Sequence, residues 1–358
     1  GAGGRPVWER APQGMSMYVY DLPAVWETGL LSKYSECSTY QWAMESKLPR
    51  MLRAHFGAAD GATADYFLVP FLSKCYFNHV AKMDRGKMNA VFVEIVKHVE
   101  GSYPYWARSG GRDHVFIFPS GVGASMFPDW QAHIRSSIFL LAEGDRTKEY
   151  INTFKDIIVP AVSSTKGGAA RAWRPLGDRR RLLFFRGKFD QKIADFSGKT
   201  TRSPLALRVK LAKLLAGHED VMFSDKRMEE GKYEEEAAGS VFCACPRGST
   251  PWTRRVYDAI FAGCIPVVIS DHIEFPFEDF INYDQFSVKV LEADAAKPGH
   301  LLNTLRAISG ARRQEKLDAM ARVRAAFVYE GGYALNAVLW ELHKRRRDFK
   351  HSSTSSWT

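Results

Sequence analysis

The sequence predicts an α/β protein in which strands and helices alternate to form two doubly wound parallel sheets. Short apolar runs typical of buried strands alternate with segments of helical periodicity in each half of the chain. Between the halves, residues 160–180 lose this periodicity and collect Gly, Ser and Arg. The length of 358 residues and the hydrophobic content of 46% suffice for two cores.

The first half is assigned to one Rossmann-like domain, residues 14–165. Its strand candidates are YVYDL, DYFLVP and HVFIFP, and helical patterns at residues 39–55 and 88–103 separate them. Pro49 is expected to kink the first of these helices, because proline removes a backbone donor. The second half, residues 180–330, is assigned to another such domain, with strands expected in RLLFFRG, VMFS, VFCAC and IPVVIS.

Residues 241–290 read as one strand, loop, helix and strand unit. The apolar run that ends at Cys245 is stopped by Pro246, and an apolar helical pattern follows before the next buried-strand run. Gly263 is expected to end the helix. Polar chemistry is therefore confined to the loop between the first strand and the helix.

This loop has the features of an anion site. Thr253 lies where an N-cap belongs, so the free N–H groups of the helix would point into the loop beside Arg247, Arg254 and Arg255. A diphosphate fits such a site, since arginines hold phosphate oxygens in bidentate fashion. Asp258, one turn later, could reach a ribose hydroxyl.

These residues resemble the exostosin-like glycosyltransferases (GT47 type), inverting enzymes that use sugar nucleotides. The resemblance covers about residues 16–290. It rests on MYVYDLP, ADYFLVP, DHVFIFP and LLFFRG in the family's order, and above all on PRGSTPWTRRVYDAIFAGCIPVVISD followed by PFEDF. The YDLP opening, the placement of Cys37 and Cys75, and YPYW resemble plant-type members such as the xylan xylosyltransferases.

The resemblance implies the GT-B architecture, with two Rossmann-like domains facing each other across a cleft. A C-terminal helix in residues 331–350 would cross back and brace the first domain. Because GT-B enzymes neutralise the diphosphate with helix N-termini and basic side chains, neither a metal nor a cofactor is expected. Trp252 could stack on a ring or simply pack. The expected donor-binding residues are Arg186, Arg247, Ser249, Thr250, Thr253, Arg254, Arg255 and Asp258.

The implied reaction is displacement at the anomeric carbon of a UDP-sugar by an acceptor hydroxyl of an oligosaccharide or glycoprotein. Xylose is the first donor expected, with arabinofuranose, galactose and glucuronic acid as alternatives. The base should come from the first domain. Asp113 and His114 match the family's recurring pair, although they precede a strand. Many plant relatives carry a His-Asp pair after this strand, where Ser120 and Gly121 stand here. Other candidates are Lys74, His79, Asp129 and His133.

The net charge of +10 is compatible with more than one class of function. It suits an acidic glycan or a sugar nucleotide, but it also arises from solvated surface. Nucleic-acid binding is not expected, since no recognised module interleaves basic and aromatic residues. A partner subunit of low activity, in a homo- or hetero-dimer, and a polyanion-binding protein are the alternatives to an active transferase.

The resemblance also implies a setting, namely the Golgi lumen as a type II membrane protein, with an N-terminal anchor missing from this sequence. The sequence itself contains no apolar run of about 18 residues and no signal-peptide pattern. Five cysteines allow at most two disulfides. Cys37 and Cys75 are the expected pair, and three buried core thiols are expected at Cys243, Cys245 and Cys264.

Overall fold

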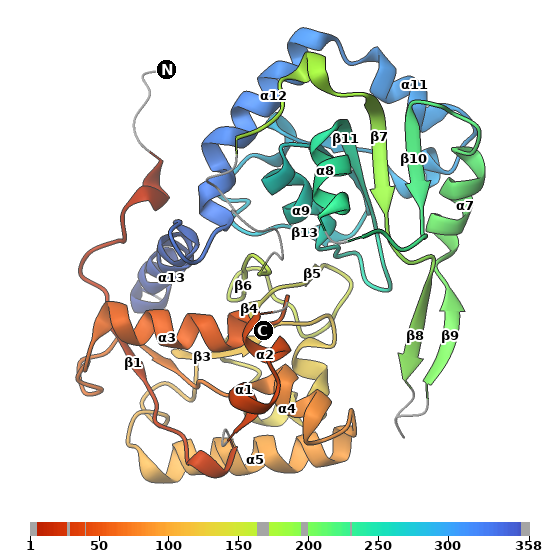
Figure 1. Cartoon of the computed structure of the whole chain (residues 1–358). Coiled ribbons are helices and arrows are strands. Elements are labelled where there is room, and N and C mark those ends of the chain that lie inside the picture. Colours follow the sequence, from red (N-terminus) through yellow and green to blue (C-terminus); the bar gives the residue numbers. More distant parts are fainter. Residues whose placement is uncertain are drawn as a thin grey trace.

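A computed structural model describes residues 6–26, 29–39, 41–162, 172–194, 200–229 and 231–351. It contains two five-stranded sheets whose neighbouring strands are all parallel, one from each half of the chain (Figure 1). The predicted fold class, α/β with two doubly wound parallel sheets, is confirmed.

The first sheet has the strand order β1-β2-β3-β4-β6. Successive side chains along each strand point to opposite faces of the sheet, so the two faces pack in different hydrophobic clusters. On β2, Tyr66 and Leu68 face the cluster that includes residues of helix α3, whereas Phe67 faces the cluster of helix α5. The bounds are β1 (Met17–Val19), β2 (Tyr66–Leu68), β3 (His114–Phe118), β4 (Ile138–Leu141), β6 (Ile157–Ile158), α3 (Met44–Phe56) and α5 (Arg85–Ser102). Pro49 lies inside α3, which continues through it.

The C-terminal helix α13 (Ala334–His351) packs against the first sheet and α3 (Figure 1). The Tyr66 hydroxyl donates to the Leu342 carbonyl at 2.8 Å. The buried Arg345 donates to the carbonyls of Lys155 and Asp156, at 2.9 and 2.6 Å. Residues of α13 also belong to the hydrophobic cluster that extends into the second sheet, so this helix joins the two halves.

The second sheet has the order β10-β7-β11-β12-β14. The chain leaves β7 toward β10 on one side and returns to β11 on the other, so the strand order reverses between β7 and β11. Ligands of open parallel sheets bind outside the carboxyl ends of the strands at such a point. The strands are β7 (Arg181–Arg186), β10 (Val221–Ser224), β11 (Ser240–Pro246), β12 (Ile265–Ile269) and β14 (Val288–Lys289), and the covering helices include α7 (Ala206–Leu214), α8 (Lys232–Ala238) and α9 (Arg255–Ala262).

Two small antiparallel pairs complete the arrangement. β8 (Asp190–Ala194) and β9 (Thr200–Pro204) form a hairpin that projects beyond β7 (Figure 1). β5 (Gly144–Asp145) pairs with β13 (Ile273–Glu274), which ties the loop after β4 to the second half.

None of the helices among the described residues is long and apolar enough to cross a membrane.

The remaining elements are short or peripheral. These elements are η1 (Val7–Glu9), η2 (Ala24–Trp26), α1 (Leu30–Lys33), α2 (Glu36–Thr39), α4 (Ser73–His79), η3 (Gly123–Met126), α6 (Trp130–His133), η5 (Leu176–Asp178), η6 (Tyr283–Gln285), α10 (Glu292–Ala295), α11 (His300–Ala307), α12 (Gly310–Val323) and η7 (Arg324–Phe327).

The expected interdomain linker, residues 160–180, lies partly outside the described residues, which resume at residue 172. Its end after residue 172 is anchored to helix α9 and strand β11 of the second half. Trp173 donates from Nε1 to the Phe261 carbonyl at 3.2 Å, and the buried Arg179 donates to the Ser240 carbonyl at 3.0 Å.

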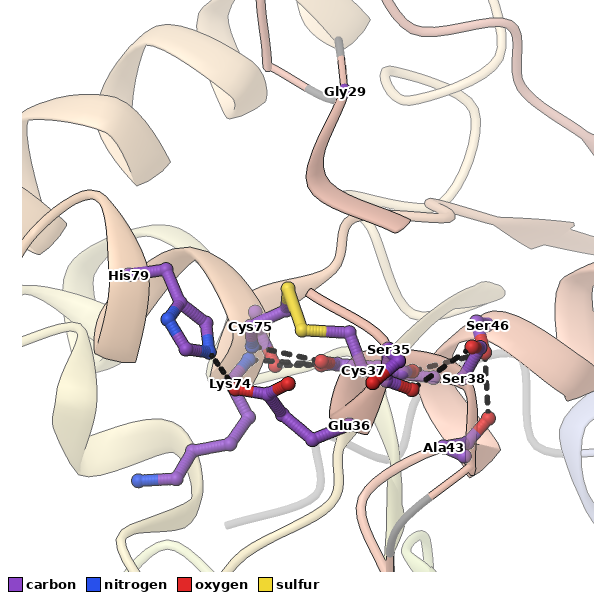
Figure 2. The surroundings of a disulfide bond; sticks show 12 residues. Gly29, Ser35, Glu36, Cys37, Ser38, Ala43, Ser46, Lys74, Cys75 and His79 are labelled. Carbon is purple, nitrogen blue, oxygen red and sulfur yellow. Dashed lines mark hydrogen bonds and ion pairs between the residues drawn. A yellow bond between two sulfur atoms is a disulfide. The ribbon is translucent and has the colours of Figure 1, made fainter. Parts of the chain in front are cut away.

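The structure contains two disulfides among its described residues. The expected Cys37–Cys75 pair is confirmed, with Cα atoms 5.6 Å apart (Figure 2). The expectation of three core thiols is wrong, because Cys243 and Cys264 form a second disulfide with the same Cα separation. β11 and β12 are neighbours, so Cys243 lies beside the start of β12, a register that alternation along one strand does not reveal. Cys245 remains a buried thiol, and burial raises its pKa to about 12.

Candidate active site

The predicted donor loop lies at the reversal point of the second sheet. Arg186 ends β7 and Arg247 follows β11, and these two strands are parallel neighbours, so both residues lie at the same edge. A direct contact joins the two segments, since Nε of Arg255 donates to the Arg186 carbonyl at 2.9 Å. The structure therefore brings Arg186, Arg247 and Arg255, three of the predicted donor-binding residues, to one edge of the sheet.

The Arg255 side chain is fixed through Nε, and its two terminal nitrogens are available to a ligand. Its guanidinium carbon lies 5.0 Å from the centroid of the Phe185 ring. A Cβ at Gly187 would overlap the Arg255 side chain, so glycine gives it room. Among the described residues, the two terminal nitrogens of Arg255 make no hydrogen bond or ion pair, and those of Arg186 make none either; Arg186 donates only from Nε, to the Lys226 carbonyl at 2.8 Å. The terminal groups of both arginines can receive an anion.

The helix start differs from the prediction by one residue. α9 begins at Arg255 with Arg254 at the N-cap position, and no side chain caps it, so the expectation that Thr253 is the N-cap is wrong. The Thr253 hydroxyl is buried without a hydrogen-bond partner among the described residues. A buried polar group left unpaired costs about 1–3 kcal/mol. An unpaired hydroxyl beside the helix start therefore suggests a polar ligand there.

Other predicted residues of this loop already have partners. Nε of Arg254 lies 3.3 Å from Oδ2 of Asp258, whose carboxylate is buried rather than open to a ribose. Arg247 lies 3.7 Å from Oε1 of Glu292. Ser249 is exposed. Trp252 packs against the hydrophobic core of the second sheet, as the packing alternative requires.

Arg208 of α7 supports the loop and has no counterpart in the sequence prediction. Its buried guanidinium donates to three carbonyls, those of Arg247 at 2.9 Å and of Lys188 and Pro246 at 3.1 Å each. Burial lowers the pKa of Arg208 to about 9. This side chain fixes the segments that follow β7 and β11 relative to each other. No sequence pattern signals the role, because α7 follows the hairpin and its position in space depends on the fold.

Glu143 faces the donor loop from the first half of the chain. It follows β4, and its carboxylate accepts a hydrogen bond from the Thr250 hydroxyl at 2.8 Å. Burial raises the pKa of Glu143 to about 7. A Cβ at Gly121 would overlap Oε2 of Glu143 and crowd Thr250, so glycine after β3 makes room for this carboxylate. The sequence could have indicated Glu143, since EGD directly follows a buried-strand run and residues after such strands lie at the carboxyl edge of the sheet, where ligands bind.

Two more polar groups lie at this carboxyl edge of the first sheet. The Ser120 hydroxyl, after β3, is buried without a hydrogen-bond partner among the described residues. Lys74, after β2, is buried, and its ammonium lies 5.2 and 5.0 Å from the ring centroids of Trp42 and Phe77. Burial lowers its pKa. Figure 2 shows this ammonium turned away from the disulfide of the neighbouring Cys75.

Asp113 and His114 lie at the opposite end of the first sheet, where β3 begins. Both are buried. Nδ1 of His114 is 2.8 Å from Oδ1 of Asp113, and Nε2 is 2.8 Å from the Tyr20 hydroxyl. Arg108 pairs with Asp113 at 3.0 Å. Burial lowers the pKa of His114, while hydrogen bonds from His114 and Ser109 hold the pKa of Asp113 below its usual range. The structure does not bring this pair to the donor loop.

The other base candidates are also engaged elsewhere. Asp129 accepts from Asn89 at 2.7 Å on the surface, and His133 stacks on Phe127. His79 lies 3.2 Å from Glu36 beside the first disulfide (Figure 2). Within the described residues, the group with the spacing of a metal site is Cys37, Cys75 and His79, and its two sulfurs are bonded to each other.

A groove of about 880 Å³ opens beside the β5–β13 pair. Its lining comes from both halves of the chain and includes none of the predicted donor-binding residues. Charged side chains that line the groove are already paired with one another, such as Arg146 with Glu278 at 2.7 Å. The arginine-rich loop, rather than this groove, is the candidate active site.

Two parallel sheets, with an arginine-rich loop at the reversal point of the second, agree with the two-domain architecture of glycosyltransferases that the sequence resemblance implies. The chain belongs to the exostosin GT47 family, since residues 11–305 match the Exostosin GT47 domain.

Two relatives of the chain have names that contain the word glucuronosyltransferase. The chain is 29% identical over 297 residues to a "Probable glucuronoxylan glucuronosyltransferase" of Arabidopsis thaliana, covering 78% of this chain and 62% of that protein. It is 30% identical over 294 residues to a "Probable glucuronosyltransferase" of Oryza sativa subsp. japonica, covering 79% and 67%. The chain thus spans 62% of the length of the first of these relatives. A crystal structure of the glycotransferase of kitacinnamycin matches with a TM-score of 0.39 and 11% identity, over 93% of this chain and 100% of that one.

Proposed function

We propose that this protein is an inverting glycosyltransferase that moves a sugar from a UDP-sugar to a hydroxyl of a glycan acceptor. The observation that carries the proposal is the cluster of Arg186, Arg255 and the unpaired Thr253 hydroxyl at the reversal point of the second sheet. Arginine forks and a helix start stabilise the charge that develops on a departing diphosphate. These groups supply positive charge for the diphosphate, which supports a donor site that works without a metal ion.

The acceptor is proposed to be a polysaccharide of the xylan class. The motifs of the chain resemble xylan xylosyltransferases, which favours xylose as the donor sugar. The names of the relatives instead contain glucuronoxylan and glucuronosyl, which favours glucuronic acid. Both sugars occur in the same polymer, so UDP-xylose and UDP-glucuronic acid are the first donors to test, with UDP-arabinofuranose and UDP-galactose after them. The proposed setting is the Golgi lumen, as a type II membrane protein.

The test is a transfer assay with purified protein, each of these four UDP-sugars and xylo-oligosaccharide acceptors, with EDTA or with manganese. We expect UDP release and an elongated or branched product with one donor, in the presence of EDTA. The anomeric configuration of the product, read by NMR, should be opposite to that of the donor. UDP binding without transfer to any acceptor would favour a partner subunit of low activity, and the absence of both would refute the proposal.

A further inference from the structure

Glu143 is a buried carboxylate placed between the two halves of the molecule. The residue is 8% exposed and lies at the carboxyl edge of the first sheet, after β4. It accepts a hydrogen bond from Thr250, three residues before Thr253 in the donor loop. Of the acidic residues considered so far, it is the one that joins the first half directly to that loop.

The groups that face Glu143 leave it able to accept a proton. Thr250 and the backbone of Gly121 stabilise its charged form by hydrogen bonds, and the positive charge of Lys74 acts in the same direction. Asp145 acts in the opposite direction. Tyr150 and Tyr257 also lie within electrostatic range, and burial holds both phenols in the neutral form. Burial outweighs the stabilising contacts and brings the carboxyl pKa to about 7.

The space around the carboxylate depends on a glycine. Gly121 allows the close approach of Glu143 and Thr250, because any side chain there would collide with both. The neighbouring Ser120 hydroxyl is buried, and no described residue hydrogen-bonds to it. It is thus a second unpaired polar group, on the side of the first sheet, in addition to the Thr253 hydroxyl on the other side.

We propose that Glu143 is the general base of the transfer, the group that takes the proton from the acceptor hydroxyl. This inference rests on the proposed function. The acceptor oxygen forms a bond to the anomeric carbon, and its proton passes to the Glu143 carboxylate. The bond from the anomeric carbon to the β-phosphate oxygen breaks, and its electron pair leaves with UDP. The Thr250 hydroxyl occupies the position from which the acceptor hydroxyl would donate, so substrate replaces this contact.

The alternatives fit less well. Asp113 and His114 lie at the opposite end of the sheet. Asp145 accepts hydrogen bonds from the backbone and hydroxyl of Thr147, at 3.0 and 2.6 Å, so its carboxylate is used locally. Lys74 is cationic in the state that stabilises the Glu143 carboxylate, and an ammonium cannot accept a proton.

The test compares Glu143→Gln with wild type and with Glu149→Gln, a matched change at an exposed residue of the same segment. We expect Glu143→Gln to lower kcat by about 10²- to 10⁴-fold, the usual contribution of a general base. It should keep the rise in melting temperature that UDP causes, and Glu149→Gln should change neither quantity. In wild type, kcat should rise with pH through about 7, where Glu143 loses its proton, and this rise should be absent from the residual activity of Glu143→Gln.

Three results would overturn the inference. Activity of Glu143→Gln within about threefold of wild type would show that the carboxylate takes no part in the proton transfer, while leaving the proposed function intact. Loss of UDP binding in the same variant would show that Glu143 supports the donor loop through Thr250 instead. A wild-type protein that neither binds UDP nor transfers any sugar would overturn the proposed function and this inference together.

Discussion

Replacement of Arg208 by methionine tests the architecture of the donor site without touching the groups expected to contact the donor. Methionine keeps an unbranched chain of similar length but removes the three hydrogen bonds to the carbonyls of Lys188, Pro246 and Arg247. These carbonyls belong to the last residue of β11 and to the segments that follow β7 and β11. The substitution should therefore loosen the loop relative to the edge of the sheet.

The magnitude follows from two opposing contributions. Hydrogen bonds from a charged donor contribute about 1.5–3 kcal/mol each, so the three together contribute roughly 5–9 kcal/mol. Burial of the charge, which lowers the pKa of Arg208 to about 9, opposes this by about 5 kcal/mol at 1.36 kcal/mol per pKa unit. The net loss for Arg208→Met is about 2 kcal/mol, which corresponds to roughly 4–8 °C in melting temperature for a domain of this size.

The assay combines thermal unfolding with titration of UDP. We expect the lower melting temperature together with UDP affinity weakened by about tenfold, equivalent to about 1.4 kcal/mol. Arg202→Met is the matched control, because Arg202 is exposed on the hairpin and pairs with Asp190 at the surface. Such a pair contributes about 0–1 kcal/mol. An Arg208→Met protein with the melting temperature and UDP affinity of wild type would refute this account of the loop.

Three further predictions follow from the buried groups. Replacing Cys243 and Cys264 together by serine should lower the free energy of unfolding by about 3.4 kcal/mol in the chain-entropy treatment of a loop with sequence separation 21, as measured by denaturant unfolding; a change below about 1 kcal/mol would contradict it. Glu143 has a pKa raised from 4.5 to about 7, so its contribution to stability is fully present below pH 4.5 and is lost as the pH rises through about 7. The stability of Glu143→Gln relative to wild type should therefore rise between pH 5 and 8, by up to about 3 kcal/mol, and a difference that is constant with pH would exclude the raised pKa. Asp113→Asn should lower the melting temperature, because it weakens a buried network, but should leave kcat within about twofold of wild type; a loss of kcat at unchanged stability would return Asp113 to the catalytic candidates.

The sequence was sufficient for the parts of the fold that depend on local pattern. The apolar runs before Pro246 and after Gly263, with a helical period between them, became β11, α9 and β12. The edge on which Arg186 and Arg247 meet also followed, because the carboxyl ends of parallel strands share one edge. The sequence also gave a reason to doubt Asp113 and His114 as the catalytic base, since the pair comes before the apolar run of its strand and not after it.

The features that the sequence did not predict depend on which elements become neighbours. Cys243 bonds to Cys264 because β11 and β12 pair in a particular register. Arg208 reaches the donor loop because α7 packs beside β10 of the second sheet, and Glu143 meets Thr250 because the two halves of the chain touch there. The one-residue difference at the start of α9 is of the same kind, since a threonine before a helix pattern caps it only if the backbone turns at that residue.

The most direct test of the central claim is calorimetric titration of UDP into the wild-type protein and into Arg255→Ala, both in EDTA. The account predicts that wild type binds UDP without a metal ion, and that Arg255→Ala binds at least about tenfold more weakly while it remains folded at the temperature of the titration. UDP binding that requires added manganese, or that is equal in the two proteins, would contradict the proposed donor site.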